Sequence, residues 1–144
     1  MEKIIRRHFT LVDTGAIYAL ADERDRWHKP MVSHLETNAD RLVVPITVIP
    51  EACYLLNHFL GTKAEEAFVA SLARLELALE SFSNEDLKRT LEVLKKYQSV
   101  DIGFVDASIV AVSERLGIEK ILTTDRKHFG MIRPNHVRSF TLLP

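Results

Sequence analysis

The chain has 144 residues, of which 47% are hydrophobic and 27% are charged, and its formal net charge at pH 7 is −1. This composition is ordinary for a globular domain with one core. It excludes a broadly basic nucleic-acid-binding surface, so any contact with RNA or DNA must come from a local patch. No apolar run approaches the roughly 20 residues that a membrane-spanning helix needs.

Nothing in the sequence divides the chain. It contains no internal repeat or low-complexity tract, and its five glycines and five prolines are too scattered to mark a linker. We therefore expect a single domain over residues 1–144. The N-terminal stretch "MEKIIRRHFT" lacks the long apolar segment and the cleavage site of a signal peptide. The single cysteine, Cys53, cannot form an internal disulfide, and both features favour a cytoplasmic protein.

The first half of the chain alternates short β-branched runs with helical segments. "HFTLVDT" predicts a strand, "GAIYALADE" a helix, and "RDRWHKPMVSHLETN" a second helix that is broken or begins near Pro30. "RLVVP" predicts the next strand. "ITVIPEACYLLNHFLG" predicts an apolar helix with Pro50 in its first turn and Gly61 at its end. "TKAEEAFVASLARL" predicts a helix that opens with Thr62 and Glu65 at capping-box spacing.

The second half continues the alternation. "ELALES" predicts a short strand, and "SNEDLKRTLEVLKKYQ" a helix with Ser83 as its N-cap and leucines at 87, 91 and 94. "FVDASIVAVSERLG" predicts a helix closed by Gly117, with residues 105, 109, 112 and 116 on one apolar stripe. "EKILTTD" and "VRSFTLL" predict two further strands. This alternation is typical of an α/β protein with a parallel sheet and helices on both faces.

Four acids occupy equivalent places in this pattern. Asp13 and Asp125 end predicted strands, Asp106 lies in the first turn of a predicted helix, and Glu51 lies in the first turn or two of another. Parallel sheets bind ligands beyond the carboxyl ends of their strands. Carboxylates that converge in apolar surroundings need a positive partner, and Mg²⁺ or Mn²⁺ is bound well by oxygen ligands alone. The sequence therefore predicts a metal site.

Each acid also has an ordinary explanation. Asp106 is acceptable as a first-turn acid of a helix, Asp125 as a turn residue and Glu51 as a surface residue of an amphipathic helix. For any one acid this explanation is preferred. For four acids in matching positions, beside the hydroxyl groups of Thr14, Thr123 and Thr124, the site is preferred.

Two other enzyme classes use similar motifs. The triplet "DTG" at Asp13 occurs in aspartic proteases, but those proteins are almost wholly β, and here the triplet leads into a predicted helix. Phosphatases of the haloacid-dehalogenase type need Asp-x-Asp after the first strand, whereas this chain has Asp13-Thr14-Gly15 followed by Ala16, so the second Asp is missing. Both hypotheses are weaker than the metal site.

Three stretches of the sequence resemble the PIN domain family: "VDTGAIYAL", "PITVIPEACYLL" and "DIGFVDASIVAVSERLGIEKILTTDRKHF". They occur in order and at family-like spacing over nearly the whole chain. The similarity is close to the VapC-type ribonuclease toxins of toxin–antitoxin pairs and to their stand-alone relatives. The resemblance implies an α/β fold, a three-layer α/β/α sandwich with a central, mainly parallel sheet. It also implies an acidic site for Mg²⁺ or Mn²⁺, in which the family's four acids fall on Asp13, Glu51, Asp106 and Asp125.

By the same resemblance the protein is expected to be a metal-dependent endoribonuclease that hydrolyses RNA phosphodiester bonds and leaves 5′-phosphate and 3′-hydroxyl ends. RNA is then the substrate, an antitoxin protein a candidate partner, and a homodimer the expected assembly. We expect Asp13 and Asp106 to be direct metal ligands, with Glu51 and Asp125 binding a second ion or acting through water. The alternative is a PIN-fold protein that binds RNA or a partner without cleaving.

Some neighbouring residues are candidates for supporting roles, among them Thr14, Thr123 and Arg126. Thr14 falls on the hydroxyl that often follows the family's first acid, and Gly15 stands where many members carry Ser. Arg24, Arg26, Arg126 and Lys127 are expected at the rim, where they either contact phosphates or are solvated. Trp27 and Tyr18 are expected to be partly buried, although either ring could stack on a base. For His28 and His128 a surface position is preferred, and Asp101 is expected to cap the loop before the helix that carries Asp106.

Overall fold

The structure, a computed structural model, describes residues 8–144. Residues 1–7, which hold most of the N-terminal segment expected not to be a signal peptide, lie outside the described residues. Over residues 8–144, no helix combines the length and the apolar character that crossing a membrane requires.

The described chain is built on an all-parallel five-stranded sheet with the strand order β3-β2-β1-β4-β5. Its strands are β1 (Phe9–Val12), β2 (Arg41–Pro45), β3 (Ala78–Glu80), β4 (Lys120–Leu122) and β5 (Thr141–Leu143). The central strand β1 pairs with both β2 and β4, so that Leu11 lies between Val43 and Ile121. These three side chains are buried, as is typical of a parallel sheet covered on both faces.

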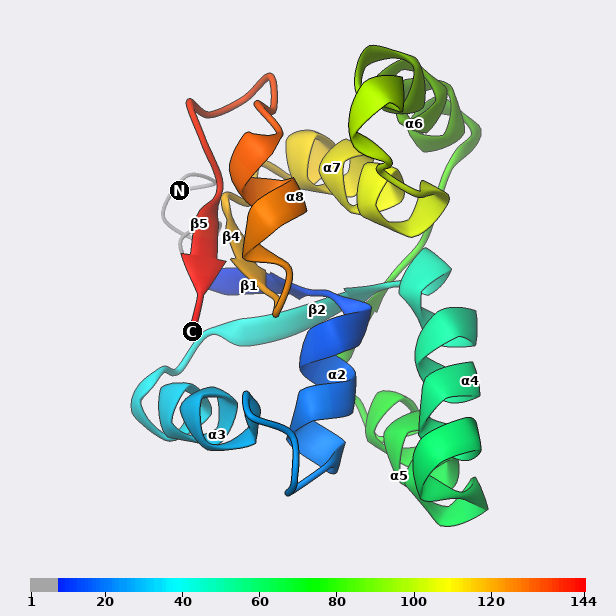
Figure 1. Cartoon of the computed structure of the whole chain (residues 1–144), viewed down its shortest axis with the longest axis vertical. Helices are drawn as coiled ribbons and strands as arrows, with labels where there is room; N and C mark the ends of the chain where they lie inside the picture. Colours follow the sequence, from blue (N-terminus) through cyan, green and yellow to red (C-terminus); the bar gives the residue numbers. More distant parts are fainter. Residues whose placement is uncertain (1–7) are drawn as a thin grey trace.

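The strand order explains why helices cover both faces. From β1 to β3 the chain moves across the sheet in one direction, and from β3 to β5 it returns in the other. Because crossovers between parallel strands are right-handed, the two directions place their helices on opposite faces. Figure 1 shows β1 and β2 between these two layers of helices. One layer holds α2 (Thr14–Ala21), α3 (His28–Thr37), α4 (Ile49–Leu60) and α5 (Thr62–Ala73), and the other holds α6 (Asn84–Lys96), α7 (Phe104–Leu116) and α8 (Arg126–Met131). The expected three-layer α/β/α sandwich is confirmed.

Most predicted elements are confirmed within a few residues of their expected ends, and two details differ. The short helix α8 was not predicted, because its six residues are too few to show an apolar period. The predicted capping box at the start of α5 is wrong. Gly61, with φ 94°, occupies the cap position, and Glu65 accepts a hydrogen bond from the Asn57 side chain at 2.6 Å. Two 3₁₀ turns, η1 (Ile46–Val48) and η2 (Gln98–Val100), precede α4 and α7.

Helix α6 turns a polar face toward the rest of the protein. The leucines that predicted it are largely on the outside, since Leu87 is 48% and Leu91 53% exposed. Its buried face instead holds Asp86, Thr90 and Val93. The reason is a polar network that requires Asp86 to point inward.

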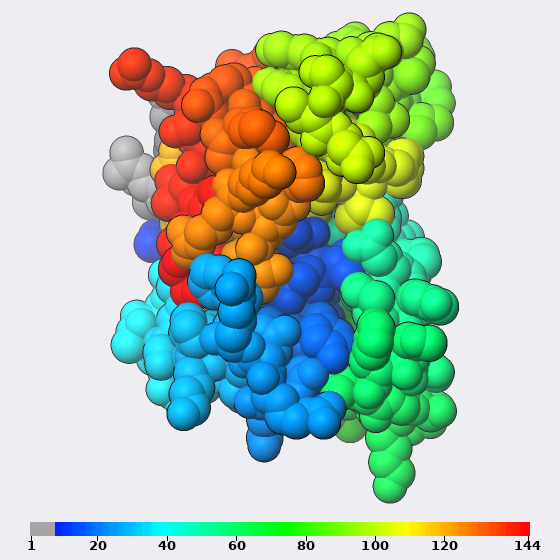
Figure 2. All heavy atoms as spheres, viewed as in Figure 1, coloured from blue at the N-terminus to red at the C-terminus, as the bar shows by residue number. Residues whose placement is uncertain are grey.

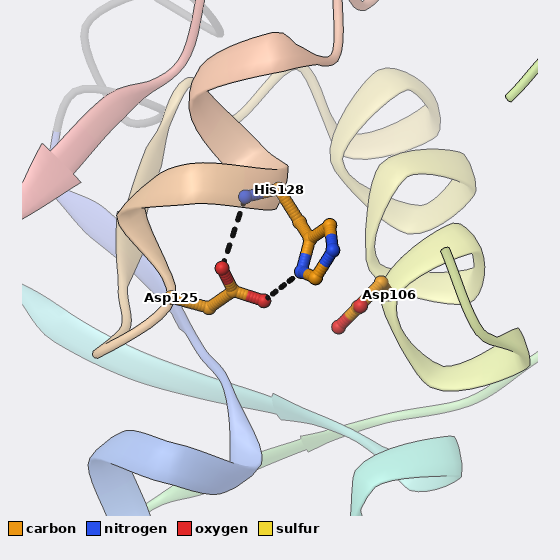
Figure 3. A group of neighbouring side chains, drawn as sticks. All are labelled: Asp106, Asp125 and His128. Atoms are coloured by element: carbon orange, nitrogen blue, oxygen red, sulfur yellow. Dashed lines mark hydrogen bonds and ion pairs between the residues drawn. The ribbon is translucent and has the colours of Figure 1, made fainter. Parts of the chain in front are cut away.

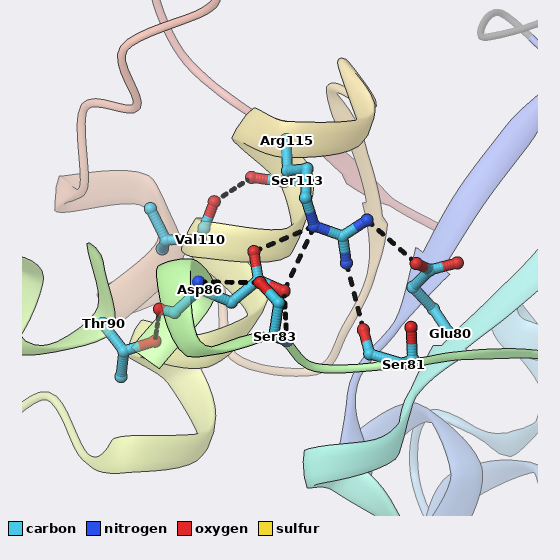
Figure 4. Close-up of polar contacts among 8 residues, drawn as sticks. All are labelled: Glu80, Ser81, Ser83, Asp86, Thr90, Val110, Ser113 and Arg115. Atoms are coloured by element: carbon cyan, nitrogen blue, oxygen red, sulfur yellow. Dashed lines mark hydrogen bonds and ion pairs between the residues drawn. The ribbon is translucent and has the colours of Figure 1, made fainter. Parts of the chain in front are cut away.

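This network joins the ends of three elements (Figure 4). Arg115, near the end of α7, donates from Nε to Asp86 at 2.9 Å, from Nη1 to Glu80 at 3.0 Å, and from Nη2 to the carbonyl oxygen of Ser81 at 3.0 Å. Asp86 also completes a capping box with Ser83 at the start of α6. Burial by itself would raise the pKa of Asp86, but the hydrogen bonds from Arg115 and Ser83 lower it. The network therefore fixes α7, whose other end carries Asp106.

We predict that Asp86→Ala destabilises the protein by about 2–3 kcal/mol, because it removes the Asp86 half of the capping box and leaves the Arg115 guanidinium without its most buried partner. Glu92→Ala is the matched control, since it removes an exposed carboxylate of the same helix that also pairs with an arginine and should cost less than about 1 kcal/mol. Urea unfolding of both variants measures the difference. Equal losses would show that the network contributes no more than a surface ion pair.

Candidate metal centre

Asp13 lies directly after the central strand β1 and is only 5% exposed. It is the N-cap of α2, and its Oδ1 accepts a hydrogen bond from the backbone N–H of Thr14 at 2.7 Å. Its Oδ2 accepts a second hydrogen bond from the hydroxyl of Thr123 at 2.8 Å. Both carboxylate oxygens are thus held in place at the carboxyl end of the sheet.

Thr123 connects Asp13 to Asp125 across the neighbouring strand end. The Thr123 hydroxyl that donates to Asp13 also accepts the backbone N–H of Asp125 at 2.9 Å. Asp125 is the N-cap of α8, because its Oδ1 accepts the backbone N–H of His128 at 2.9 Å. Strands β1 and β4 are adjacent, but the helices that follow them lie on opposite faces, and this divergence opens a crevice at the strand ends.

Glu51 and Asp106 approach the same crevice from helix starts. Glu51 lies in the first turn of α4 and Asp106 in the first turn of α7. A cavity of about 490 Å³ is lined by all four predicted acids. It lies where α2, α4, α7 and α8 meet, and the space-filling view is recessed there (Figure 2). Its other lining residues are Thr14, Gly15, Leu55, Gly103, Phe104, Val105 and Thr124.

The acids affect one another's ionisation. Burial, together with the charges of Glu51 and Asp125, raises the pKa of Asp13 to about 6, although the hydrogen bonds from Thr123 and Thr14 lower it. Burial also raises the pKa of Asp106 to about 7, with added repulsion from Asp13 and Asp125 and with His128 acting in the opposite direction. The cavity therefore disfavours its own full negative charge and would be stabilised by a bound cation.

His128 belongs to this group, although the sequence favoured a surface position for it. Its Nδ1 lies 2.7 Å from Oδ2 of Asp125, and its ring lies beside Asp106 (Figure 3). One potential metal-binding atom from each of Asp106, Asp125 and His128 lies within 4.8 Å of the other two. In the sequence, His128 stands three residues after Asp125. This spacing predicts a contact between the two side chains only if a helix begins after Asp125, and α8 is too short to be recognised from the sequence.

The cavity has the properties of a metal site beyond its charge. The hydroxyl oxygen of Thr14 is buried at the cavity and has no hydrogen-bond partner among residues 8–144. A buried polar atom of this kind needs a partner from outside the chain, such as an ion or its water. Carboxylate oxygens together with a hydroxyl form the ligand set of a hard divalent cation. These residues can therefore hold a metal ion.

Gly15 leaves room for a second hydroxyl at the cavity. A Cβ atom at Gly15 would lie 2.3 Å from Oγ1 of Thr124, which is too close for any side chain. A side chain at residue 15 would therefore require Thr124 to change its rotamer and move its hydroxyl away from the cavity end of α2. The missing side chain at Gly15 thus lets the Thr124 hydroxyl lie over the start of α2.

The other candidate residues lie around this cavity or outside it. Arg126 directly follows Asp125, and its guanidinium lies over the ring of Trp27. Tyr18 and Trp27 are half-buried, as expected. His28 is half-buried, with Nδ1 2.8 Å from the Ala19 carbonyl oxygen, rather than free on the surface. Asp101 lies in the loop before α7, where it ends the 3₁₀ turn η2 in a left-handed conformation with φ 57°, and Gly103 is the N-cap of α7 itself.

The fold also decides against the protease hypothesis. The Asp-Thr-Gly triplet leads from a parallel strand into α2, whereas an aspartic protease is almost wholly β. The acidic cavity is formed within one chain by Asp13 and three acids from other elements.

Comparisons with known proteins agree with this architecture. The model of the PIN domain family matches residues 10–132. Ribonuclease VapC26 of Mycobacterium tuberculosis is 32% identical over 134 residues, which is 93% of this chain and 99% of the relative. The crystal structure of M. tuberculosis VapC20, described as a sarcin-ricin loop cleaving toxin, has a TM-score of 0.80 at 23% identity, covering 90% of this chain and 98% of that one.

A more distant structure shows the same fold. VapBC2 of Rickettsia felis, solved bound to a DNA fragment from its promoter, has a TM-score of 0.67 at 12% identity, covering 94% of this chain and 99% of that one. The family match, the relative and the fold lead to one conclusion: this chain belongs to the PIN domain family.

Proposed function

We propose that this protein is a Mg²⁺- or Mn²⁺-dependent endoribonuclease of the VapC type, acting as a single PIN-like domain over residues 1–144. The observation that carries the proposal is that the chain keeps all four acids of the family pattern and that all four line one cavity at the carboxyl end of the sheet. Similarity to a ribonuclease along almost the entire chain supports the choice of RNA as substrate.

In this proposal Asp13 and Asp106 hold the metal directly, while Glu51 and Asp125 hold a second ion or act through water. When bound, a divalent cation supplies the positive charge that a phosphodiester needs in order to react with water. Thr123 and the N–H of Thr14 orient the Asp13 carboxylate, and Thr14 and Thr124 line the same cavity. His128, held by Asp125, is placed to accept or donate a proton at the cavity.

The remaining expectations are part of the same proposal. The protein acts in the cytoplasm and forms a homodimer. It is the toxin of a toxin–antitoxin pair, and a structural relative solved as a toxin–antitoxin complex supports this part of the proposal. The alternative is a PIN-fold protein that binds RNA or a partner without cleaving. Loss of an acid would have favoured it, and this chain has lost none.

We predict that the purified protein cleaves RNA in Mg²⁺ or Mn²⁺ and is inactive in EDTA. Asp13→Asn should lower the cleavage rate by at least about 100-fold, because it removes a charged metal ligand at nearly constant volume. Gel analysis of RNA oligonucleotides measures the rate, and p-nitrophenyl phosphate is the control substrate. Full activity in EDTA would contradict the metal mechanism. Metal-dependent hydrolysis of p-nitrophenyl phosphate without RNA cleavage would favour a phosphatase.

We predict that Asp106→Asn stabilises the metal-free protein by something on the order of 1 kcal/mol at about pH 8, because it relieves repulsion in the cavity. Mg²⁺ or Mn²⁺ should raise the melting temperature of the wild type, since a ligand of the folded state stabilises it, and should raise that of the variant much less. Thermal melting with and without metal tests both effects.

The same variant should change the pH dependence of stability. The folded pKa values of Asp13 and Asp106, about 6 and about 7, lie above the unfolded value of about 4. Their contribution to stability is complete below the unfolded pKa and is lost as the pH rises through the folded values. From about pH 5 to about pH 8 the metal-free wild type should therefore lose more stability than Asp106→Asn. Parallel pH profiles would place Asp106 outside the acidic cluster.

We predict that expression of the wild type alone slows bacterial growth and that Asp13→Ala relieves the effect, because toxicity requires cleavage in this proposal. Growth curves at equal protein levels measure the difference. Equal toxicity of the two proteins would exclude cleavage as its cause, and no toxicity from an active enzyme would indicate a stand-alone ribonuclease.

A further inference from the structure

Two arginines and the single tryptophan form a cluster at the edge of the acidic cavity. The guanidinium carbons of Arg26 and Arg126 lie 5.6 and 5.3 Å from the centroid of the Trp27 ring. Arg26 and Trp27 belong to the segment that joins α2 to α3, and Arg126 follows Asp125 of the cavity. Figure 2 shows this segment against the first turn of α8. We call these three residues the arginine–tryptophan cluster.

The segment between α2 and α3 is held in shape by two aspartates. Asp22 accepts the hydroxyl of Tyr18 at 2.7 Å and the backbone N–H of Arg24 at 3.0 Å. Asp25 accepts the backbone N–H of Trp27 at 2.8 Å. Both carboxylates therefore serve the loop itself, and the loop presents the cluster in a fixed position.

The cluster carries positive charge that the described chain does not pair with a carboxylate side chain. Within residues 8–144, neither Arg26 nor Arg126 lies within ion-pair distance of an Asp or Glu side chain, although Asp22 pairs with Arg24 nearby. Arg126 also donates to an oxygen of Pro144, the last residue of the sequence, which offsets part of its charge, whereas Arg26 has no such contact among residues 8–144. Both arginines are exposed. Two cations against one ring repel each other, so an external anion would stabilise the cluster.

The chemistry of the cluster favours a phosphate as that anion. A guanidinium has several N–H donors in one plane, which match the oxygens of a phosphate. An aromatic ring under the guanidinium fixes its orientation and leaves its edge free to bind. The acidic cavity repels an RNA strand until its charge is neutralised, and positive charge beside it offsets that repulsion.

We propose that Arg26 and Arg126, stacked on Trp27, bind the backbone phosphate that flanks the scissile one on the Asp125 side of the cavity. This inference rests on the proposed function, because it takes RNA as the substrate. Of the four basic residues expected at the rim of the site, it assigns the phosphate contact to Arg26 and Arg126. The contact is with the backbone, so it strengthens binding to RNA of every sequence equally.

The experiment measures binding separately from cleavage, in an Asp106→Asn background with Mg²⁺. The affinity for a labelled single-stranded RNA oligonucleotide is measured by fluorescence anisotropy over a range of salt concentrations. In Arg26→Gln and in Arg126→Gln, the logarithm of the affinity should fall less steeply with the logarithm of the salt concentration, the slope being smaller in magnitude by about 0.7. Each variant should therefore bind RNA about fivefold more weakly than the parent at ~0.1 M salt and nearly as tightly as the parent at about 1 M salt. Arg138→Gln is the control with the same charge change, because Arg138 is exposed and precedes β5, at the amino end of the strands and not at the carboxyl end where the cavity lies.

Trp27 provides a second measurement, because it is the only tryptophan of the chain. Its emission should change when RNA binds and should change less in the Arg26→Gln Arg126→Gln double variant. Melting temperatures of the arginine variants should match that of the parent, which excludes misfolding as the cause of weaker binding.

Affinities and salt slopes of the two arginine variants equal to those of Arg138→Gln would overturn the inference. Unchanged RNA affinity together with lost binding to poly-glutamate would instead make the cluster a docking site for an acidic protein. The two proposals can fail separately. If the wild type never cleaves RNA but binds it through both arginines, the proposed function is refuted and the phosphate contact stands. If both arginine variants cleave and bind RNA normally, the phosphate contact is refuted and the proposed function stands.

Discussion

The burial of the Asp13 carboxylate is the constraint on which the rest of the site depends. An ionised carboxylate loses its hydration when it is buried, and only hydrogen bonds or an opposite charge can compensate. Asp13 has two donors, the N–H of Thr14 and the hydroxyl of Thr123, yet its pKa remains raised to about 6. Fixed donors hold the side chain in place, and a bound cation would offset the part of the desolvation cost that these donors leave.

The topology of the sheet brings the other acids to Asp13. The chain leaves β1 on one face and β4 on the other, so the crevice between these adjacent strands stays open. Thr123 and Asp13, 110 residues apart in sequence, are joined by a hydrogen bond at this place. Helices α4 and α7 begin beside it, and their first turns supply Glu51 and Asp106. The cavity is thus a consequence of strand order.

Acids elsewhere in the protein are compensated within the chain, which distinguishes them from the cavity acids. Asp86 is as buried as Asp13, but Arg115 and Ser83 lower its pKa. Asp22 and Asp25 receive backbone N–H groups and shape a loop. The charged neighbours of Asp106, in contrast, are the acids Asp13, Asp125 and Glu51, together with His128. Structural acids thus have positive or hydrogen-bond-donating neighbours, whereas the acids of the cavity have mainly other acids beside them and would be stabilised by a bound cation.

The sequence by itself determined the order and type of most elements, because strands such as "RLVVP" and helices such as "FVDASIVAVSERLG" have the local pattern of their final conformation. It also indicated the four acids, since each follows a predicted strand or begins a predicted helix. That residues 1–144 form one domain, and that these acids are catalytic, stay predictions.

Only the tertiary structure decided which neighbours each side chain has. The outward position of Leu87 and Leu91 follows from the inward ion pair of Asp86, which depends on Arg115 of another helix. The place of His128 depends on a six-residue helix without a visible period. The stacking of Arg126 on Trp27 joins segments that no local pattern connects. Local patterns record which face of an element is apolar, whereas ion pairs and ring stacking depend on how distant segments pack together.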